Sequence, residues 1–118
     1  MAPCYEATHR PALANFYLLS VTGPKLPADL KSADMEKTVA AKAEVISWLK
    51  RSLDAVKSAR VGLKPADLQR SVKINGRDAT VDGMYLRIIV HANEHMGQLV
   101  AYARMNGIVP PWSDGIKN

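Results

Sequence analysis

Apolar residues recur at steps of three and four in two long stretches of the chain, which is the spacing of one face of an α-helix. The first stretch predicts a helix from about Lys31 to Ala59, with Ser32 able to cap its start and Gly62 ending it. Its stripe consists of Met35, Val39, Lys42, Ile46, Leu49, Leu53 and Val56.

The second stretch predicts a helix from about Val81 to Asn106. Thr80 or Asp82 can cap its start, and Gly107 ends it. Its stripe consists of Met84, Ile88, His91, His95, Leu99 and Tyr102.

Shorter elements are predicted before and between these helices. A helix over Ala12–Val21, with Pro11 in its first turn, would bury a face formed by Leu13, Phe16, Tyr17 and Ser20. Pro65 can open a short helical turn through Arg70, and Asn75-Gly76 is typical of a tight turn within a small hairpin.

Together these elements predict an all-α fold in which the two long helices form an antiparallel pair. A length of 118 residues fits a single domain covering residues 1–118. Three helices are recognisable, and a bundle of four would cover both stripes better.

Composition excludes several classes of protein. A single cysteine, Cys4, rules out an intrachain disulfide scaffold, and its place in an unstructured start favours an inert thiol. No apolar run approaches the ~20 residues of a membrane helix, and Met1–Arg10 lacks the apolar core of a signal peptide. We therefore expect a cytoplasmic protein without a membrane partner.

The net charge of +5 is compatible with a nucleic-acid partner. The basic residues are spread along the chain, however, and aromatic residues are few, at 6%. This pattern favours a solvated basic surface over a nucleic-acid interface.

His91 and His95 are the main candidates for chemistry. Four residues of α-helix turn through ~400° and rise ~6 Å, so both imidazoles can reach one divalent metal ion. Hydrogen-bonded core histidines are the alternative, and the spacing leaves both interpretations open. His9, near the start of the first helix, is the candidate for a third ligand.

The segment from His91 to His95 also matches the H-x-x-E-H string of the inverzincin metallopeptidases, with Glu94 as general base. Those enzymes need a downstream acidic ligand, and Asp114 is the one acidic residue after His95, which disfavours this interpretation. A metal-bound histidine usually donates its second ring N–H to a neighbour, for which Glu94, Gln98 and Asn93 are candidates.

The end of the chain resembles the last helix of the DinB/YfiT-like family of bacterial four-helix bundles. The similarity covers the stretch His91-Ala-Asn-Glu-His-Met-Gly-Gln-Leu99, then Tyr102 and Arg104, then Asn106-Gly107 and Pro110-Pro111. Asn15-Phe16-Tyr17 with an upstream histidine is similar to the helix that carries the family's first metal ligand.

This resemblance implies an up-down bundle whose core holds a divalent ion on His91, His95 and His9. Zn²⁺ or Ni²⁺ would be the ion, with Fe or Mn as further options. Relatives of known activity are similar to metal-dependent transferases that activate a low-molecular-weight thiol, so a thiol S-transferase or hydrolase-like activity on a small molecule is expected.

Family members usually have a further helix before the first one recognised here. The chain is accordingly a shortened member, or a second copy covers the open surface in a homodimer. The alternative function is a non-enzymatic helical dimerisation module whose histidines are structural.

Overall fold

The computed structural model describes the backbone of residues 2–30 and 41–113, and the side chains of those residues from 11 onward. It is mostly helical. Its elements are α1 (Ala2–Val21), α3 (Lys42–Val61), α4 (Pro65–Leu68), β1 (Ser71–Ile74), β2 (Arg77–Thr80), α5 (Val81–Met105) and the 3₁₀-helix η1 (Pro111–Ser113).

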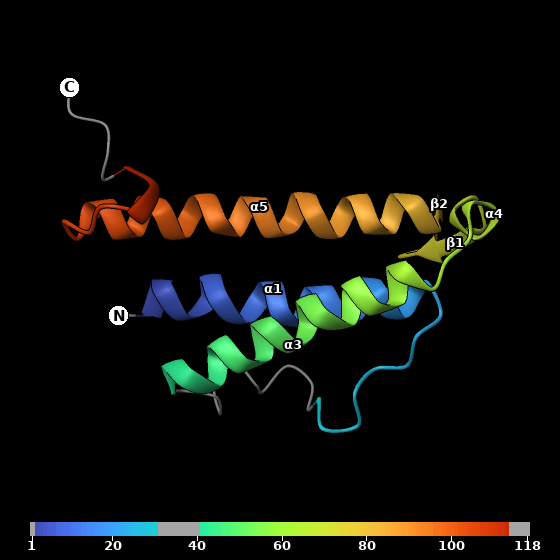
Figure 1. Ribbon diagram of the computed structural model, residues 1–118, viewed down its shortest axis with the longest axis horizontal. Helices are drawn as coiled ribbons and strands as arrows, with labels where there is room; N and C mark the ends of the chain where they lie inside the picture. The colour runs from blue at the N-terminus through green and yellow to red at the C-terminus, as the bar shows by residue number, and fades with distance from the viewer. Residues whose placement is uncertain (1, 31–40, 114–118) are drawn as a thin grey trace.

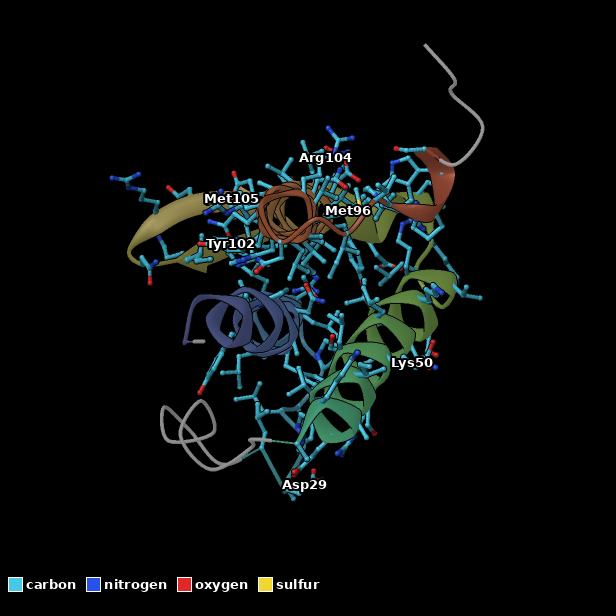
Figure 2. The ribbon with its side chains drawn as sticks, turned by 90° about the vertical axis from the view of Figure 1, so that its left-hand side faces the viewer. Asp29, Lys50, Met96, Tyr102, Arg104 and Met105 are labelled. Atoms are coloured by element: carbon cyan, nitrogen blue, oxygen red, sulfur yellow. The ribbon has the colours of Figure 1, made fainter. Side chains whose placement is uncertain are left out.

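Helix α1 is the central element, because both α3 and α5 pack against it. Figure 1 shows α5 running antiparallel beside α1, while α3 crosses α1 obliquely and runs in the same direction as α1. Viewed end-on in Figure 2, the three long helices lie at the corners of a triangle. The predicted helical bundle is confirmed, but α1 and α3 do not alternate in direction.

Helix α5 begins and ends as the sequence predicts. The Thr80 hydroxyl accepts a hydrogen bond from the Gly83 amide at 3.1 Å, which caps the first turn. At the other end Gly107 has a φ of +73°. The amides of Gly107 and Ile108 donate to the carbonyls of Arg104 and Ala103, the pattern of a Schellman motif.

The predicted hairpin and helical turn are also confirmed. Strands β1 and β2 pair antiparallel, and Asn75 and Gly76 both have positive φ, at 50° and 75°. Two consecutive left-handed residues form the type I′ turn whose twist matches that of a hairpin. Helix α4 begins with Pro65 in its first turn.

Helix α1 is longer than predicted. It begins at Ala2, so Pro11 lies in its interior and Cys4 lies within helical backbone rather than in an unstructured start. The proline of the first turn is instead Pro3, where no intrahelical N–H bond is required. Pro11 costs the helix one backbone hydrogen bond but does not end it.

Helix α3 is shorter than predicted. Ala41 has extended backbone angles, φ −80° and ψ 128°, so the helix begins at Lys42 and does not continue from Lys31. An extended residue at this position cannot take part in the i to i−4 hydrogen-bond pattern of a helix, so Ala41 marks the N-terminal boundary of α3. The predicted cap Ser32 and the stripe residues Met35 and Val39 lie outside the described residues.

The buried face of α3 is rotated from the predicted stripe toward small residues. Val45 and Ser52 are buried, whereas Ile46 and Leu53 are 43% and 36% exposed. Ala55, Val56 and Ala59 pack against the core formed by Leu19, Val72, Val81, Met84, Tyr85 and Ile88. Val56 of the predicted stripe therefore lies on the buried face. The small residues Ser52, Ala55 and Ala59, which allow helix backbones to approach closely, are not part of that stripe.

The buried face of α1 also differs from the predicted one. Tyr17, predicted to be buried, is 45% exposed, and Asn15 is fully buried together with Ala12, Phe16 and Leu19. The Asn15 side-chain amide donates to the Ser52 hydroxyl at 3.1 Å, and that hydroxyl donates to the Leu49 carbonyl at 2.8 Å. A polar pair therefore fixes the contact between α1 and α3.

The segment after α1 is held against α3 by a charged pair. Arg51 donates to both carboxylate oxygens of Asp29, at 2.5 and 2.7 Å, and its guanidinium lies 4.7 Å from the centre of the Trp48 ring. The hydrogen bond from Arg51 lowers the pKa of Asp29 below its ordinary value. The Arg70 side chain donates to the Thr22 carbonyl, which joins the end of α1 to the segment before β1.

Two further features concern the surface. Within residues 2–30 and 41–113, no helix combines the length and the apolar character needed to cross a lipid bilayer. Four large apolar residues of α5 are exposed by 42% or more, and the surface they form is here called the outer face of α5: Leu86, Ile89, Val90 and Met96.

The buried pair between α1 and α3 gives the first prediction. Replacing Ser52 by Ala removes the acceptor of the buried Asn15 amide, so the free energy of unfolding should fall by about 1–2 kcal/mol. Urea denaturation followed by circular dichroism measures this change. Ser58→Ala, at an exposed position of the same helix, is the control, and an equal loss in both variants would contradict the assignment.

Candidate metal-binding site and adjoining groove

His91 and His95 lie one turn apart on α5, as predicted. Their ring centroids are 4.6 Å apart and the ring planes are nearly perpendicular, at 85°. Both side chains are partly buried. The structure thus brings two imidazoles together on the part of α5 that adjoins α1.

Each histidine has a different hydrogen-bonding environment. The Nδ1 atom of His91 lies 3.7 Å from a carboxylate oxygen of Glu94, which is beyond direct hydrogen-bond distance but close enough for an electrostatic contact. The Nδ1 atom of His95 is buried and has no hydrogen-bond partner among the described residues. Gln98 is exposed and makes no side-chain hydrogen bond within the described part of the chain.

The electrostatic surroundings keep His91 neutral. Burial lowers the pKa of His91 below its ordinary value, and the neighbouring His95 and Arg87 lower it further, whereas Glu94 raises it. A neutral imidazole has a free lone pair and can ligate a metal ion without first losing a proton.

His91 lines a pocket of ≈510 Å³ between α1, α5 and the tip of the hairpin. Helix α1 contributes Tyr17 among other residues, and α5 contributes Arg87. A second pocket of ≈890 Å³ lies between the hairpin and the first turns of α5. Ile74, Asn75 and Arg87 line both pockets, so the two pockets adjoin each other, and together they are here called the hairpin groove.

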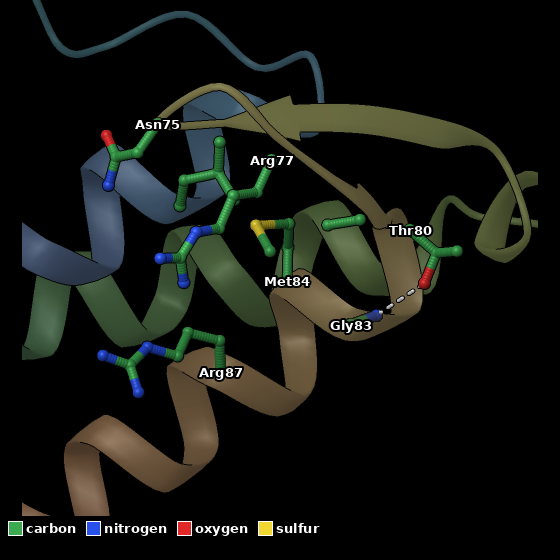
Figure 3. Close-up of a pocket in the computed structure, with 8 residues that line it drawn as sticks. Asn75, Arg77, Thr80, Gly83, Met84 and Arg87 are labelled. Carbon is green, nitrogen blue, oxygen red and sulfur yellow. Dashed lines mark hydrogen bonds between the residues drawn. The ribbon is translucent and has the colours of Figure 1, made fainter.

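Figure 3 shows the part of the hairpin groove farther from the histidines. Arg77 from β2 and Arg87 from α5 extend toward the same side of this pocket, below Asn75 at the hairpin turn. The Thr80 to Gly83 capping bond closes the opposite side.

The donor set fits a divalent ion in part. His91 and His95 place two imidazole rings side by side, and the unpartnered Nδ1 of His95 is a polar atom that a bound group would satisfy. Among the described residues, no set of three His, Cys, Asp or Glu side chains is gathered to hold a metal. His9 lies in the first half of α1, and its side chain is outside the described ones.

Several residues of this region were not predicted as site residues from the sequence. They are Tyr17, Asn75, Arg77 and Arg87. Asn75-Gly76 identifies the hairpin turn in the sequence, but its position beside α1 and α5 follows from packing. Tyr85 is a further missed feature, since its hydroxyl is buried in the core and has no hydrogen-bond partner among the described residues.

Comparison with known proteins identifies the family. The model of the family described as "Protein of unknown function (DUF1572)" matches residues 16–107, which run from within α1 to just past the end of α5. The match covers most of the chain, and the chain belongs to this family. No curated protein and no solved structure matches it.

Proposed function

We propose that the chain is a DinB-like helical metalloprotein that binds one divalent ion, Zn²⁺ or Ni²⁺, with Fe or Mn as further options. The observation that supports this proposal is the pair of adjacent imidazoles on α5, with one buried nitrogen unpartnered among the described residues. His91 and His95 would hold the ion, and His9 would be the third ligand. Glu94, whose carboxylate lies 3.7 Å from Nδ1 of His91, would orient the ring, leaving Nε2 to bind the ion.

We further propose that the site acts on a low-molecular-weight thiol, as a thiol S-transferase or hydrolase-like enzyme. A bound divalent ion supplies the deprotonation of a coordinated thiol near neutral pH. The chain's own contribution would be a groove that leads to His91 and a cationic Arg87 beside it, which attracts an anionic reactant.

Metal binding is tested directly with protein purified without a histidine tag. After incubation with Zn²⁺ or Ni²⁺ and desalting, elemental analysis should find about one ion per chain. His91→Ala and His95→Ala should each reduce the metal content to background, because the single imidazole that remains on α5 cannot hold the ion. His9→Ala should weaken affinity while leaving measurable binding.

Arg104→Ala is the control, since Arg104 is exposed on the same helix, nine residues beyond His95, and should leave the metal content unchanged. Wild-type protein that stays metal-free after loading would overturn the proposal. The histidines would then be structural residues of a non-enzymatic helical module.

The thiol step has its own measurement. Protein loaded with Co²⁺ should develop a sulfur-to-metal charge-transfer band in the near ultraviolet when 2-mercaptoethanol is added, because the thiolate enters the open position of the site. Ethylene glycol, the oxygen analogue, should give no such band. Co²⁺-loaded protein without the band in 2-mercaptoethanol would refute thiol activation and leave metal binding standing.

We also propose that two copies associate through the outer face of α5. Leu86, Ile89, Val90 and Met96 follow helical spacing along one side of a 25-residue helix. Apart from the neighbouring residues of α5 itself, no described atom lies within 4 Å of a Cβ built on Gly97, so the helix is open at this point to close approach by another helix. A two-fold pairing would bury the same row in both copies.

Sedimentation equilibrium should therefore give a mass of about twice the 12.9 kDa of one chain. Ile89→Glu should convert the protein to a monomer that keeps its helical circular-dichroism spectrum, because a buried unpaired carboxylate opposes association. Lys57→Glu, at an exposed position on α3, should remain dimeric. A monomeric wild-type chain at tens of micromolar would refute the proposed dimer.

A further inference from the structure

The hairpin presents an arginine on its helix-facing side. In an antiparallel pair, directly opposed residues project to the same face. The pairs Val72 with Ala79 and Ile74 with Arg77 therefore share one face, and Lys73 with Asp78 shares the other. Val72 belongs to the core, so the face that carries Arg77 is the one packed toward the helices.

No described carboxylate compensates the charge of this arginine. Asp78, its neighbour in sequence, is on the opposite face and bonds Lys73 at 2.7 Å. Asp82, in the first turn of α5, does not line the pocket. Arg87, which lines the same pocket, likewise has no ion-pair partner within the described residues.

Arg77 and Arg87 are both exposed to solvent and line the same pocket, so an anion that enters it meets two positive charges from two different elements. Each guanidinium presents paired N–H donors that match the two oxygens of a carboxylate or a phosphate. The Asn75 side-chain amide, which lines the same pocket, is an additional donor. We infer that Arg77, Arg87 and Asn75 bind the oxyanion group, a carboxylate or a phosphate, of a small molecule.

The position of this pocket also indicates where the rest of the molecule lies. Arg87 and His91 are one helical turn apart on α5, a rise of about 6 Å, and both line the pocket beside α1. A ligand anchored by its oxyanion at Arg77 and Arg87 extends along the hairpin groove toward the histidine pair. This second part rests on the proposed metal site, whereas oxyanion binding does not.

Oxyanion binding is tested on protein from which metal ions have been removed with a chelating resin. A soluble chelator is avoided, because it is itself a polycarboxylate and would compete with the probe for the site. Malonate and inorganic phosphate are titrated separately, and binding is measured from amide shifts in two-dimensional NMR spectra. Shifts should centre on Asn75, Gly76, Arg77 and Arg87. Arg77→Gln and Arg87→Gln should each weaken binding about tenfold, since each removes a charge-assisted donor pair.

Arg104→Gln is the matched control, because it removes the same charge from the far end of α5 (Figure 2). The affinity of this variant for malonate and phosphate should stay within about twofold of that of the wild type. Far-ultraviolet circular dichroism checks that every variant is folded. Preferential binding of malonate identifies a carboxylate ligand, and preferential binding of phosphate identifies a phosphorylated one. Absence of binding by both probes overturns the inference.

Equal weakening by Arg104→Gln also overturns it, because binding would then reflect general attraction to a chain of charge +5. A short DNA duplex that binds with steep salt dependence, whichever arginine is replaced, would point to the same non-specific attraction. Because these measurements use metal-free protein, their failure is distinguishable from failure of the metal site. Metal binding without oxyanion binding would refute this inference alone.

Discussion

The arrangement of the molecule depends on the packing of α1 between α3 and α5. Its Leu19 lies in the core with residues of α5 and the hairpin, and its Asn15 bonds Ser52 of α3. A buried polar pair is costly when mismatched, so this contact favours one register of α1 against α3 over neighbouring registers. The packing of Leu19 against the residues of α5 brings the same helix beside His91, where Tyr17 lines the pocket that His91 also lines.

The histidine pair and the two arginines occupy similar positions in the fold. Each consists of polar groups on elements whose other residues build the core, and each has capacity for a partner that the described side chains do not supply. The Nδ1 atom of His95 is buried without a partner among the described residues, whereas Arg77 and Arg87 are exposed and line the hairpin groove without a described ion-pair partner. The proposals of a metal ion at the histidines and of an oxyanion at the arginines rest on these two separate observations. The lowered pKa of His91 is consistent with the proposed metal ion, because a neutral imidazole is the ligating form.

Much of this architecture could be predicted from local sequence signals. Thr80 and Gly107 delimit α5, and Asn75-Gly76 defines the hairpin turn, since each acts through its own backbone chemistry. The i, i+4 spacing likewise predicts the contact between His91 and His95.

The errors arose where tertiary packing overrides local preference. Pro11 indicated a helix start, yet Pro3 occupies the first turn and Pro11 is interior. Large apolar residues defined the α3 stripe, whereas Ser52 faces α1 because a small side chain fits there. The hairpin groove could not be predicted, because Arg77 and Arg87 come together only after the hairpin folds back on α5.

The firm anchoring of α5 has a mechanical consequence. The helix is capped by Thr80 at one end and closed by a Schellman motif at the other, so fraying is suppressed at both termini. Arg87, His91 and His95 lie within this one uninterrupted helix, so the separations of their backbones are set by the helical repeat alone. A molecule that contacts Arg87 and His91 together therefore meets two groups whose anchor points do not depend on any loop.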